Sequence, residues 1–176
     1  MRKMDAVKNM KTKLLDYAGN EIVLDDCPGC AFARREFSLP CGMVFEDDCL
    51  TIAQDWELPI DGMLIIAPKR HVLTFAELTQ QERAEIFELA NKTIVLLKTH
   101  LPNVTYKLFF EENGRHFHVW LLPCHEWMQA AAAGNPTNNL GAVFAYAKAN
   151  LRTKQNIENI AKTCAYVREA LKQESL

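Results

Sequence analysis

The stretch NGRHFHVWLLP, at residues 113–123, constrains the fold of this chain more than any other. Side chains alternate between the two faces of a strand, so His116, His118 and Trp120 would share one face. The residues between them are apolar and would face a core on the other side: Phe117, Val119 and Leu121. The Asn-Gly pair at the start is a strong signal for a type I′ hairpin turn. The stretch therefore predicts a strand over 116–122 that returns from a hairpin.

Other segments extend this strand into a mainly antiparallel sheet. Strand-like runs lie at 43–46, 49–54, 62–67 and 104–110, and the first two are separated by an Asp-Asp pair that predicts a hairpin. The sequence TQQE at 79–82 is a capping box, and apolar residues at helical spacing follow it until Pro102. One long helix that crosses between the hairpins of an antiparallel sheet is an α+β layout.

Both ends of the chain have a helical composition. Residues 2–17 predict a helix that stops at Gly19, a plausible C-cap. The apolar spacing of residues 128–174 predicts two helices with a Gly-Asn-Pro break at 134–136. We interpret this extension as a helical layer packed on the sheet, with a partner-binding arm as the alternative. The chain is expected to form a single domain over 1–176, with a core at about 22–124.

The composition limits the classes of protein to consider. The chain has 176 residues, of which 49% are hydrophobic and 24% charged, as in ordinary soluble globular proteins. Its formal net charge of -2 gives no overall attraction to nucleic acid or to membranes. No run approaches the ~20 apolar residues of a membrane span, and the basic N-terminus has no apolar segment behind it that would make a secretory signal. A cytoplasmic protein that binds neither nucleic acid nor membrane is the default expectation.

The pair Cys27-x-x-Cys30 has the spacing of half a zinc site. A thioredoxin-like redox pair is the competing interpretation, but that motif is expected in a βαβ unit, which the surrounding sequence does not predict. A closed tetrahedral site needs two further ligands. The histidines available are His71, His100, His116, His118 and His125.

These motifs together resemble the histidine-triad (HIT) superfamily. HFHVWLLP resembles the triad motif, in which three histidines alternate with hydrophobic residues before a proline. The upstream segment VFEDDCLTIAQDWELPIDGMLIIAPKRH, at 44–71, is also similar to that family. It has an acidic turn after a Val-Phe strand, then Asp55 at the end of the next strand, then an apolar strand closing in Pro-Lys-x-His. The resemblance covers roughly 22–124, and it implies the HIT-like fold with a C-terminal helical extension that lies outside it.

The resemblance also implies roles for residues of the triad. The middle histidine, His118, would be the nucleophile, and His116 would be the first member of the triad. Zinc-containing members are similar in their CxxC, in a histidine after the Pro-Lys segment and in a ligating first triad histidine. The implied zinc ligands are Cys27, Cys30, His71 and His116. If His116 binds zinc, it is not a free acid or base, and the zinc is structural.

The resemblance implies a nucleotide as ligand and a homodimer as assembly. Asp55 falls where the family places a carboxylate on the nucleotide ribose. Apolar residues of the same segments would line the base pocket: Phe32, Val44, Phe45 and Ile52. Arg115 is the only obvious cation beside the histidines, so it is a candidate phosphate ligand, with a surface arginine at a turn as the alternative.

Trp120 stands where the family has its third histidine. An indole offers one N–H donor but no titratable proton near neutrality, so it cannot protonate a leaving group. We therefore expect cleavage of phosphoanhydrides such as dinucleoside polyphosphates, whose leaving group needs no proton, and poor cleavage of phosphoramidates. A nucleotidyl transferase or phosphorylase and a zinc-stabilised nucleotide-binding module of weak activity are the alternatives. His125 would be a substitute acid only if the chain folded back toward the triad.

Overall fold

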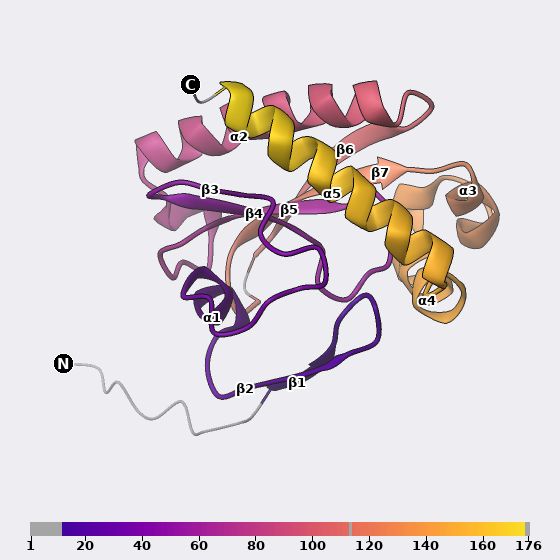
Figure 1. Cartoon of the computed structure of the whole chain (residues 1–176), viewed down its shortest axis with the longest axis horizontal. Coiled ribbons are helices and arrows are strands. Elements are labelled where there is room, and N and C mark those ends of the chain that lie inside the picture. The colour runs from indigo at the N-terminus through magenta and orange to yellow at the C-terminus, as the bar shows by residue number, and fades with distance from the viewer. Residues whose placement is uncertain (1–11, 113, 175–176) are drawn as a thin grey trace.

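A five-stranded antiparallel sheet forms the centre of the computed structural model, which describes residues 12–112 and 114–174 (Figure 1). The strand order is β3-β4-β5-β7-β6. The bounds are β3 Phe45–Glu46, β4 Leu50–Gln54, β5 Leu64–Pro68, β6 Thr105–Glu111 and β7 His118–Cys124. Each neighbouring pair is antiparallel, so β4 and β7, which flank β5, run in the same direction. The predicted α+β class and the hairpin of the first two of these strands are confirmed.

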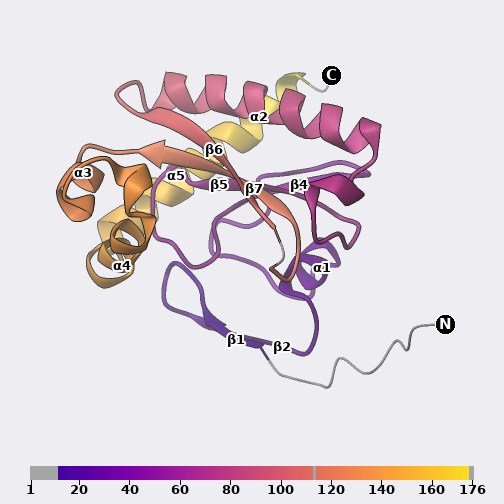
Figure 2. The same cartoon turned by 180° about the vertical axis from the view of Figure 1, so that it is seen from behind.

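The helix α2, Gln80–His100, joins β5 to β6 across the sheet (Figure 2). Its start is the predicted capping box: the Thr79 hydroxyl accepts a hydrogen bond from the Glu82 amide, and the Glu82 carboxylate accepts one from the Thr79 amide. The short 3₁₀ helix η1, Phe75–Glu77, precedes it. The predicted long crossing helix is therefore confirmed.

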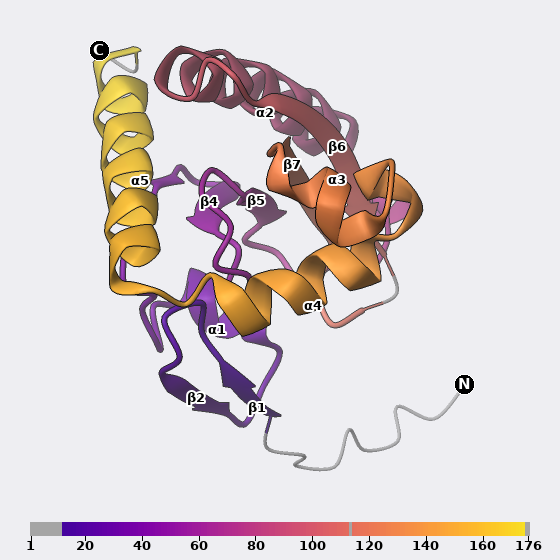
Figure 3. The ribbon, with the colours of Figure 1, turned by 90° about the vertical axis from the view of Figure 1, so that its right-hand side faces the viewer.

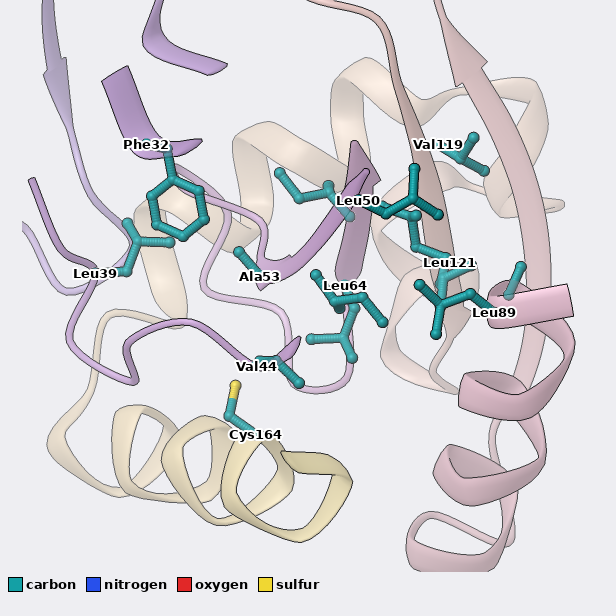
Figure 4. Packing of buried hydrophobic residues seen from close by; sticks show 14 of the residues in the cluster. Phe32, Leu39, Val44, Leu50, Ala53, Leu64, Leu89, Val119, Leu121 and Cys164 are labelled. Atoms are coloured by element: carbon teal, nitrogen blue, oxygen red, sulfur yellow. The ribbon is translucent and has the colours of Figure 1, made fainter. Parts of the chain in front are cut away.

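Two apolar clusters make up the core. The larger cluster joins the sheet to α2 and to the C-terminal helix α5, Lys154–Glu174. Figure 4 shows part of it, with Leu89 of α2 beside Leu121 of β7 and with Cys164 of α5 directed toward Val44. The smaller cluster lies where β7 ends, between Leu122 and the helices that follow this strand.

The C-terminal extension contains three helices rather than the two predicted. These are α3 Trp127–Ala132, α4 Leu140–Asn150 and α5, with the 3₁₀ helix η2, Pro136–Asn138, in the predicted break (Figure 3). A second break falls at 151–153, where the Thr153 hydroxyl caps α5 by accepting from the Asn156 amide. This break has no glycine or proline, so it gives a weaker signal in the sequence. The extension packs on the sheet, as the layer interpretation expected.

The predicted N-terminal helix over 2–17 is wrong for the part that the structure describes, and residues 2–11 lie outside that part. The chain instead forms a hairpin of β1, Thr12–Leu15, and β2, Glu21–Leu24. The Asp16 carboxylate closes the turn by accepting from the amides of Ala18 and Asn20, and Gly19 adopts a positive φ of 96°. Exposed and less exposed side chains alternate along β1, as in a strand with one face toward the protein. The composition of this segment is therefore compatible with a strand as well as with a helix.

The strand predicted over 116–122 corresponds to β7, which begins at His118, two residues later than predicted. Glu111 of β6 pairs with His118, so the two strands are joined by a longer connection than the two-residue turn predicted at Asn113-Gly114, of which Asn113 lies outside the described residues. The Phe117 amide donates to the Val72 carbonyl instead of to β6, which takes His116 out of the sheet. The CxxC lies at the start of the short helix α1, Pro28–Ala33. None of the helices within 12–112 and 114–174 has both the length and the hydropathy needed to cross a bilayer.

Candidate functional site

Four side chains converge at one point with the donor set of a metal site. One ligand atom from each of Cys27, Cys30, His71 and His116 lies within 4.8 Å of all the others. His116 Nδ1 is 3.4 Å from Cys27 Sγ and 3.7 Å from Cys30 Sγ, and His71 Nδ1 is 3.2 Å from Cys30 Sγ. Tetrahedral zinc with ordinary bond lengths separates its sulfur and nitrogen ligands by about 3.6 Å. The residues therefore fit a tetrahedral cation.

Three separate segments bring these ligands together. Cys27 is the N-cap of α1 and Cys30 lies in its first turn, where a spacing of three residues places both side chains on one face. His71 follows the end of β5 by three residues, and His116 precedes β7. His116 was expected at the start of a strand, whereas it lies in the connection before β7, with its ring against Gly29 of α1.

Hydrogen bonding prepares the His116 ring for coordination. Its Nε2 lies 2.7 Å from the Pro68 carbonyl oxygen, which only accepts, so Nε2 carries the proton and Nδ1 is free to bind a cation. Burial lowers the pKa of His116, which also favours the neutral form. Gly29 packs against this ring so closely that a Cβ at its position would lie 2.4 Å from His116 Cγ.

The thiol of Cys30 has a raised pKa in the protein without a cation. Burial and the neighbouring Cys27 thiol raise it to about 11. A coordinated divalent cation reverses this preference, because its charge favours the thiolate. The Cys30 thiol is therefore held as a protonated group that binding of a metal would deprotonate.

The ring of His118, the predicted nucleophile, is oriented by a hydrogen bond to the backbone of His116. Its Nδ1 is 3.1 Å from the His116 carbonyl oxygen, so Nδ1 donates and carries the proton. Nε2 then keeps its lone pair, and it has no hydrogen-bond partner within the part of the chain that the structure describes. This is the tautomer that a nucleophilic imidazole requires.

His118 lines a cavity of about 550 Å³ on one face of the sheet. Asp55, Arg115, His116 and Trp120, which the sequence had singled out, line the same cavity. Further lining comes from β1, from the residues after Asp55 and from α4: Leu14, Trp56, Glu57, Leu58, Phe144 and Lys148. The last two were missed, because the extension that carries them lies outside the segment that resembles a known family.

The predicted base-pocket residues are placed elsewhere. Phe32, Val44 and Ile52 are buried in the larger core cluster and do not line the cavity, and Phe45 is packed against that cluster. The sequence shows that these side chains are apolar, but it does not show which side of the sheet they face. The apolar cavity wall is instead made by Leu14, Trp56, Leu58 and Ile65.

Asp55 and Arg115 sit at different ends of the cavity. The buried Asp55 follows β4 and its Oδ1 accepts from the amides of Glu57 (3.0 Å) and Leu58 (2.9 Å). Burial raises the pKa of Asp55. Its Oδ2 accepts no hydrogen bond from the described residues, so it is available to a ligand. The exposed Arg115 guanidinium donates to the Thr12 hydroxyl, at the hairpin end.

Trp120 lies on the same face as His118, as the alternation predicted, with the buried Val119 between them. Its ring is 5.6 Å from the His118 ring and 5.6 Å from the Phe144 ring, which it meets edge-on. His125 lies beyond the far end of β7, about 20 Å from His118 at ordinary strand rise. Its Nε2 donates to the Asp61 carbonyl at 2.8 Å, so His125 does not replace the missing triad histidine.

Comparison with known proteins gives one curated relative and several solved structures. No family model matches the chain. The nitrilase and fragile histidine triad fusion protein NitFhit of Caenorhabditis elegans is 30% identical over 103 residues. The match takes in 54% of this chain but only 23% of that protein.

The solved structures agree over most of both chains. A zinc-bound histidine triad family protein from Mycobacterium smegmatis has a TM-score of 0.57 at 13% identity, over 85% of this chain and 95% of that one. A hypothetical histidine triad nucleotide-binding protein from Sulfolobus tokodaii has a TM-score of 0.56 at 21% identity, over 83% and 94%. A HIT family protein from Bacillus anthracis has a TM-score of 0.52 at 24% identity, over 80% and 96%. The chain therefore has the histidine-triad fold.

Proposed function

We propose that this protein is a member of the HIT superfamily that hydrolyses nucleotide phosphoanhydrides, such as dinucleoside polyphosphates, through a nucleotidyl-His118 intermediate. One observation carries the proposal. The imidazole of His118 is locked by the His116 carbonyl in the tautomer with a free Nε2, on the wall of a cavity whose 550 Å³ can hold a nucleotide. The Sulfolobus relative is described as nucleotide-binding, which supports a nucleotide as the ligand.

The reaction would proceed in two displacements at the α-phosphorus. His118 Nε2 donates its lone pair to phosphorus while the bond to the bridging oxygen breaks, and the leaving phosphate takes that electron pair. Water then attacks the same phosphorus and releases one proton to the solvent, the P–N bond breaks, and the imidazole recovers its lone pair. Arg115 would bind phosphate oxygens and the free Oδ2 of Asp55 would bind the ribose.

Trp120 determines which leaving groups this site can use. It brings no acid beside His118, and His125 is held at the far end of β7. A phosphate leaving group departs as an anion without a proton, whereas an amine needs one. Phosphoanhydrides are therefore the substrate class that matches the site.

Zinc is the cation proposed for the Cys27, Cys30, His71 and His116 cluster. Two thiolates and two imidazoles with tetrahedral spacing are typical of structural zinc sites, and the Mycobacterium protein is described as zinc-bound. When bound, zinc would fix the segment before β7, and with it the carbonyl that orients His118. We expect about one zinc per chain by metal analysis.

A homodimer through the β6 edge is proposed as the assembly. β6 is an edge strand of the sheet, and exposed apolar side chains lie on it and on α2: Leu108, Phe110, Phe87 and Val95. Phe87 and Phe110 contact each other edge-on with ring centroids 6.2 Å apart, so the exposed residues of the two elements are continuous at this point. A second copy would cover this apolar area and pair with the free strand edge.

Intact-protein mass spectrometry after mixing with a dinucleoside polyphosphate tests the function. The wild type should gain the mass of one nucleotidyl group, and His118→Ala should not, since only the nucleophile is lost. His125→Ala is the matched control, because it removes a histidine of the same strand region outside the cavity, and it should keep the adduct. An adduct in His118→Ala would contradict the proposal.

Two alternatives give different results in the same experiment. A nucleotidyl transferase or phosphorylase would form the adduct and pass it to added phosphate or sugar phosphate faster than to water. A binding module would bind nucleotide without an adduct or turnover, and the replacement of the third triad histidine by Trp120 is the observation that favours it.

A further inference from the structure

The helix α4 supplies a wall of the His118 cavity from outside the segment that resembles HIT proteins. Phe144 and Lys148 line that cavity, and their spacing of four residues puts them on one face of α4 about one turn apart. Phe144 meets Trp120 edge-on. Lys148 forms an ion pair with Glu57, which also lines the cavity.

The cavity has a cationic end and an aromatic end. Arg115 and the start of β7 lie at the end near the β1–β2 hairpin, where Arg115 contacts Thr12. Ile65 of β5 pairs with both Ala53 and Trp120, and the flanking strands β4 and β7 run in the same direction. Ala53 on β4 is therefore level with Trp120 on β7. The residues that follow Ala53 lie beyond that level, in the direction that leads away from His118.

That far end has the lining of a base site. Asp55 comes first along this direction, and Trp56, Leu58 and Phe144 supply aromatic and apolar surface there. With the α-phosphorus at His118 and phosphates near Arg115, the nucleoside extends past Asp55 toward these residues. Its base would then face the Glu57–Lys148 pair.

Glu57 and Lys148 form a fixed donor and acceptor pair at this end. The Glu57 amide donates to Asp55, and Arg152 donates to the Glu57 carbonyl, so the backbone of Glu57 is anchored on both sides. Lys148 Nζ bonds Glu57 Oε2. Both side chains are about half exposed, at 49% and 41%, so an entering base can reach them.

We propose that the Glu57–Lys148 pair reads the base of the substrate and selects guanine. This inference rests on the proposed nucleotide function and names its substrate class. The Watson–Crick edge of guanine presents an acceptor, O6, beside two donors, N1–H and N2–H. A carboxylate accepts the two donors in parallel, while the ammonium donates to O6. Adenine has no second donor at that edge and points the N1 lone pair toward the carboxylate.

Binding of guanosine, inosine and adenosine 5′-monophosphates, measured by isothermal titration calorimetry, tests the inference. The wild type should bind the guanosine nucleotide about tenfold more tightly than the inosine nucleotide, the change expected for one charge-assisted hydrogen bond, and should bind the adenosine nucleotide most weakly. Inosine differs from guanosine only in the missing N2 amine, so it isolates the contact to Glu57. Glu57→Gln should remove the preference for guanosine over inosine. Lys148→Met should weaken binding of both guanosine and inosine nucleotides and leave adenosine binding almost unchanged.

Glu158→Gln is the matched control, since Glu158 forms an exposed ion pair with Lys154 on α5 and does not line the cavity. It should keep the preference. Equal affinity for the three nucleotides, or a preference that survives Glu57→Gln, would overturn the guanine assignment while the His118 adduct still supports hydrolysis. A guanine preference without an adduct would support the inference and reject the hydrolase, and no nucleotide binding at all would overturn both.

Discussion

Gly29 is the residue on which the geometry of the proposed metal centre depends most directly. Any larger side chain would meet the His116 side chain, because its nearest atoms lie 2.4 to 2.7 Å from the position of a Cβ. These contacts are shorter than atoms tolerate, and the neighbour is a buried ring rather than a flexible side chain. The proposed metal centre therefore depends on the glycine of the CPGC sequence as well as on its cysteines.

Gly29→Ala should displace His116 and lower both the zinc content and the stability. We expect less than one zinc per chain and a loss of about 1–3 kcal/mol in the free energy of unfolding, the usual cost of overpacking. Metal analysis and urea unfolding would measure these effects. Gly141→Ala in α4 is the control, because no atom lies within 4 Å of its Cβ position and alanine favours a helix. Full zinc content in Gly29→Ala would contradict the expectation.

For single residues, the sequence indicated most of the side chains proposed for the metal cluster and the His118 cavity, and the structure brings them together. The spacing of Cys27 and Cys30 and the alternation of His118 and Trp120 are local properties, so they could be predicted. The environment of His116 depends on a hydrogen bond between Phe117 and Val72, which are far apart in the sequence. Local patterns do not report such contacts.

Among the elements, α2 has a tertiary anchor at its start, the contact between Glu82 and Arg70. Glu82 serves the capping box and also accepts from Arg70 at 3.1 Å (Nε) and 2.8 Å (a terminal nitrogen). This arginine contact, followed by the helix-cap hydrogen bonds, lowers the pKa of Glu82 to about 2. A group whose pKa is lower in the folded state stabilises that state above its unfolded pKa, and the stabilisation is lost as the pH falls toward the folded value.

Glu82→Gln should therefore destabilise the protein by about 1–2 kcal/mol at neutral pH, a value reduced for the half-exposed Arg70. Glutamine keeps one oxygen that accepts from the Thr79 amide, but its amide nitrogen cannot accept from Arg70, so the change removes the charge together with one Arg70 hydrogen bond. The difference from the wild type should shrink as the pH falls from about 4.5 to about 2. Urea unfolding of both proteins with a chelator would measure it.

Glu88→Gln removes the exposed pair with Lys92 on the same helix and should cost under about 0.5 kcal/mol. If the cost of Glu82→Gln were the same at low pH as at neutral pH, the charge would not be its source.

Elements with explicit start and stop signals were predictable, and those without them were not. The capping box at Thr79 located α2 to the residue. The N-terminal strand and the break between α4 and α5 had no comparable signal. The choice between helix and strand for residues 12–15 depends on pairing with β2, and the break depends on how α5 packs against the larger cluster.

For the whole molecule, the exposed apolar side chains at the β6 edge predict the assembly. Phe87→Glu should convert the proposed homodimer to a monomer, because it would bury a charge in the interface. Analytical ultracentrifugation would measure the mass, and circular dichroism would check the fold. Leu73→Glu is the control, since it changes an exposed apolar residue that lies outside α2 and β6. A wild type that sediments as a monomer would reject the dimer.

The sequence also predicted the order of the elements in the central fold, because five of its strands and α2 are each marked locally. It did not predict that α4 reaches the cavity. That contact depends on how the smaller core cluster packs around Leu122 and Val143, and no local pattern encodes such packing.

The ligand cluster joins parts of the chain that lie far apart, since Cys27 and His116 are 89 positions apart. A cross-link that closes a loop of this length removes about 4–5 kcal/mol of conformational entropy from the unfolded chain. A bound cation would have the same effect on the topology of the chain as a disulfide. If the metal were scarce, fewer molecules of the protein would fold. Each folded molecule would keep the same rate constant.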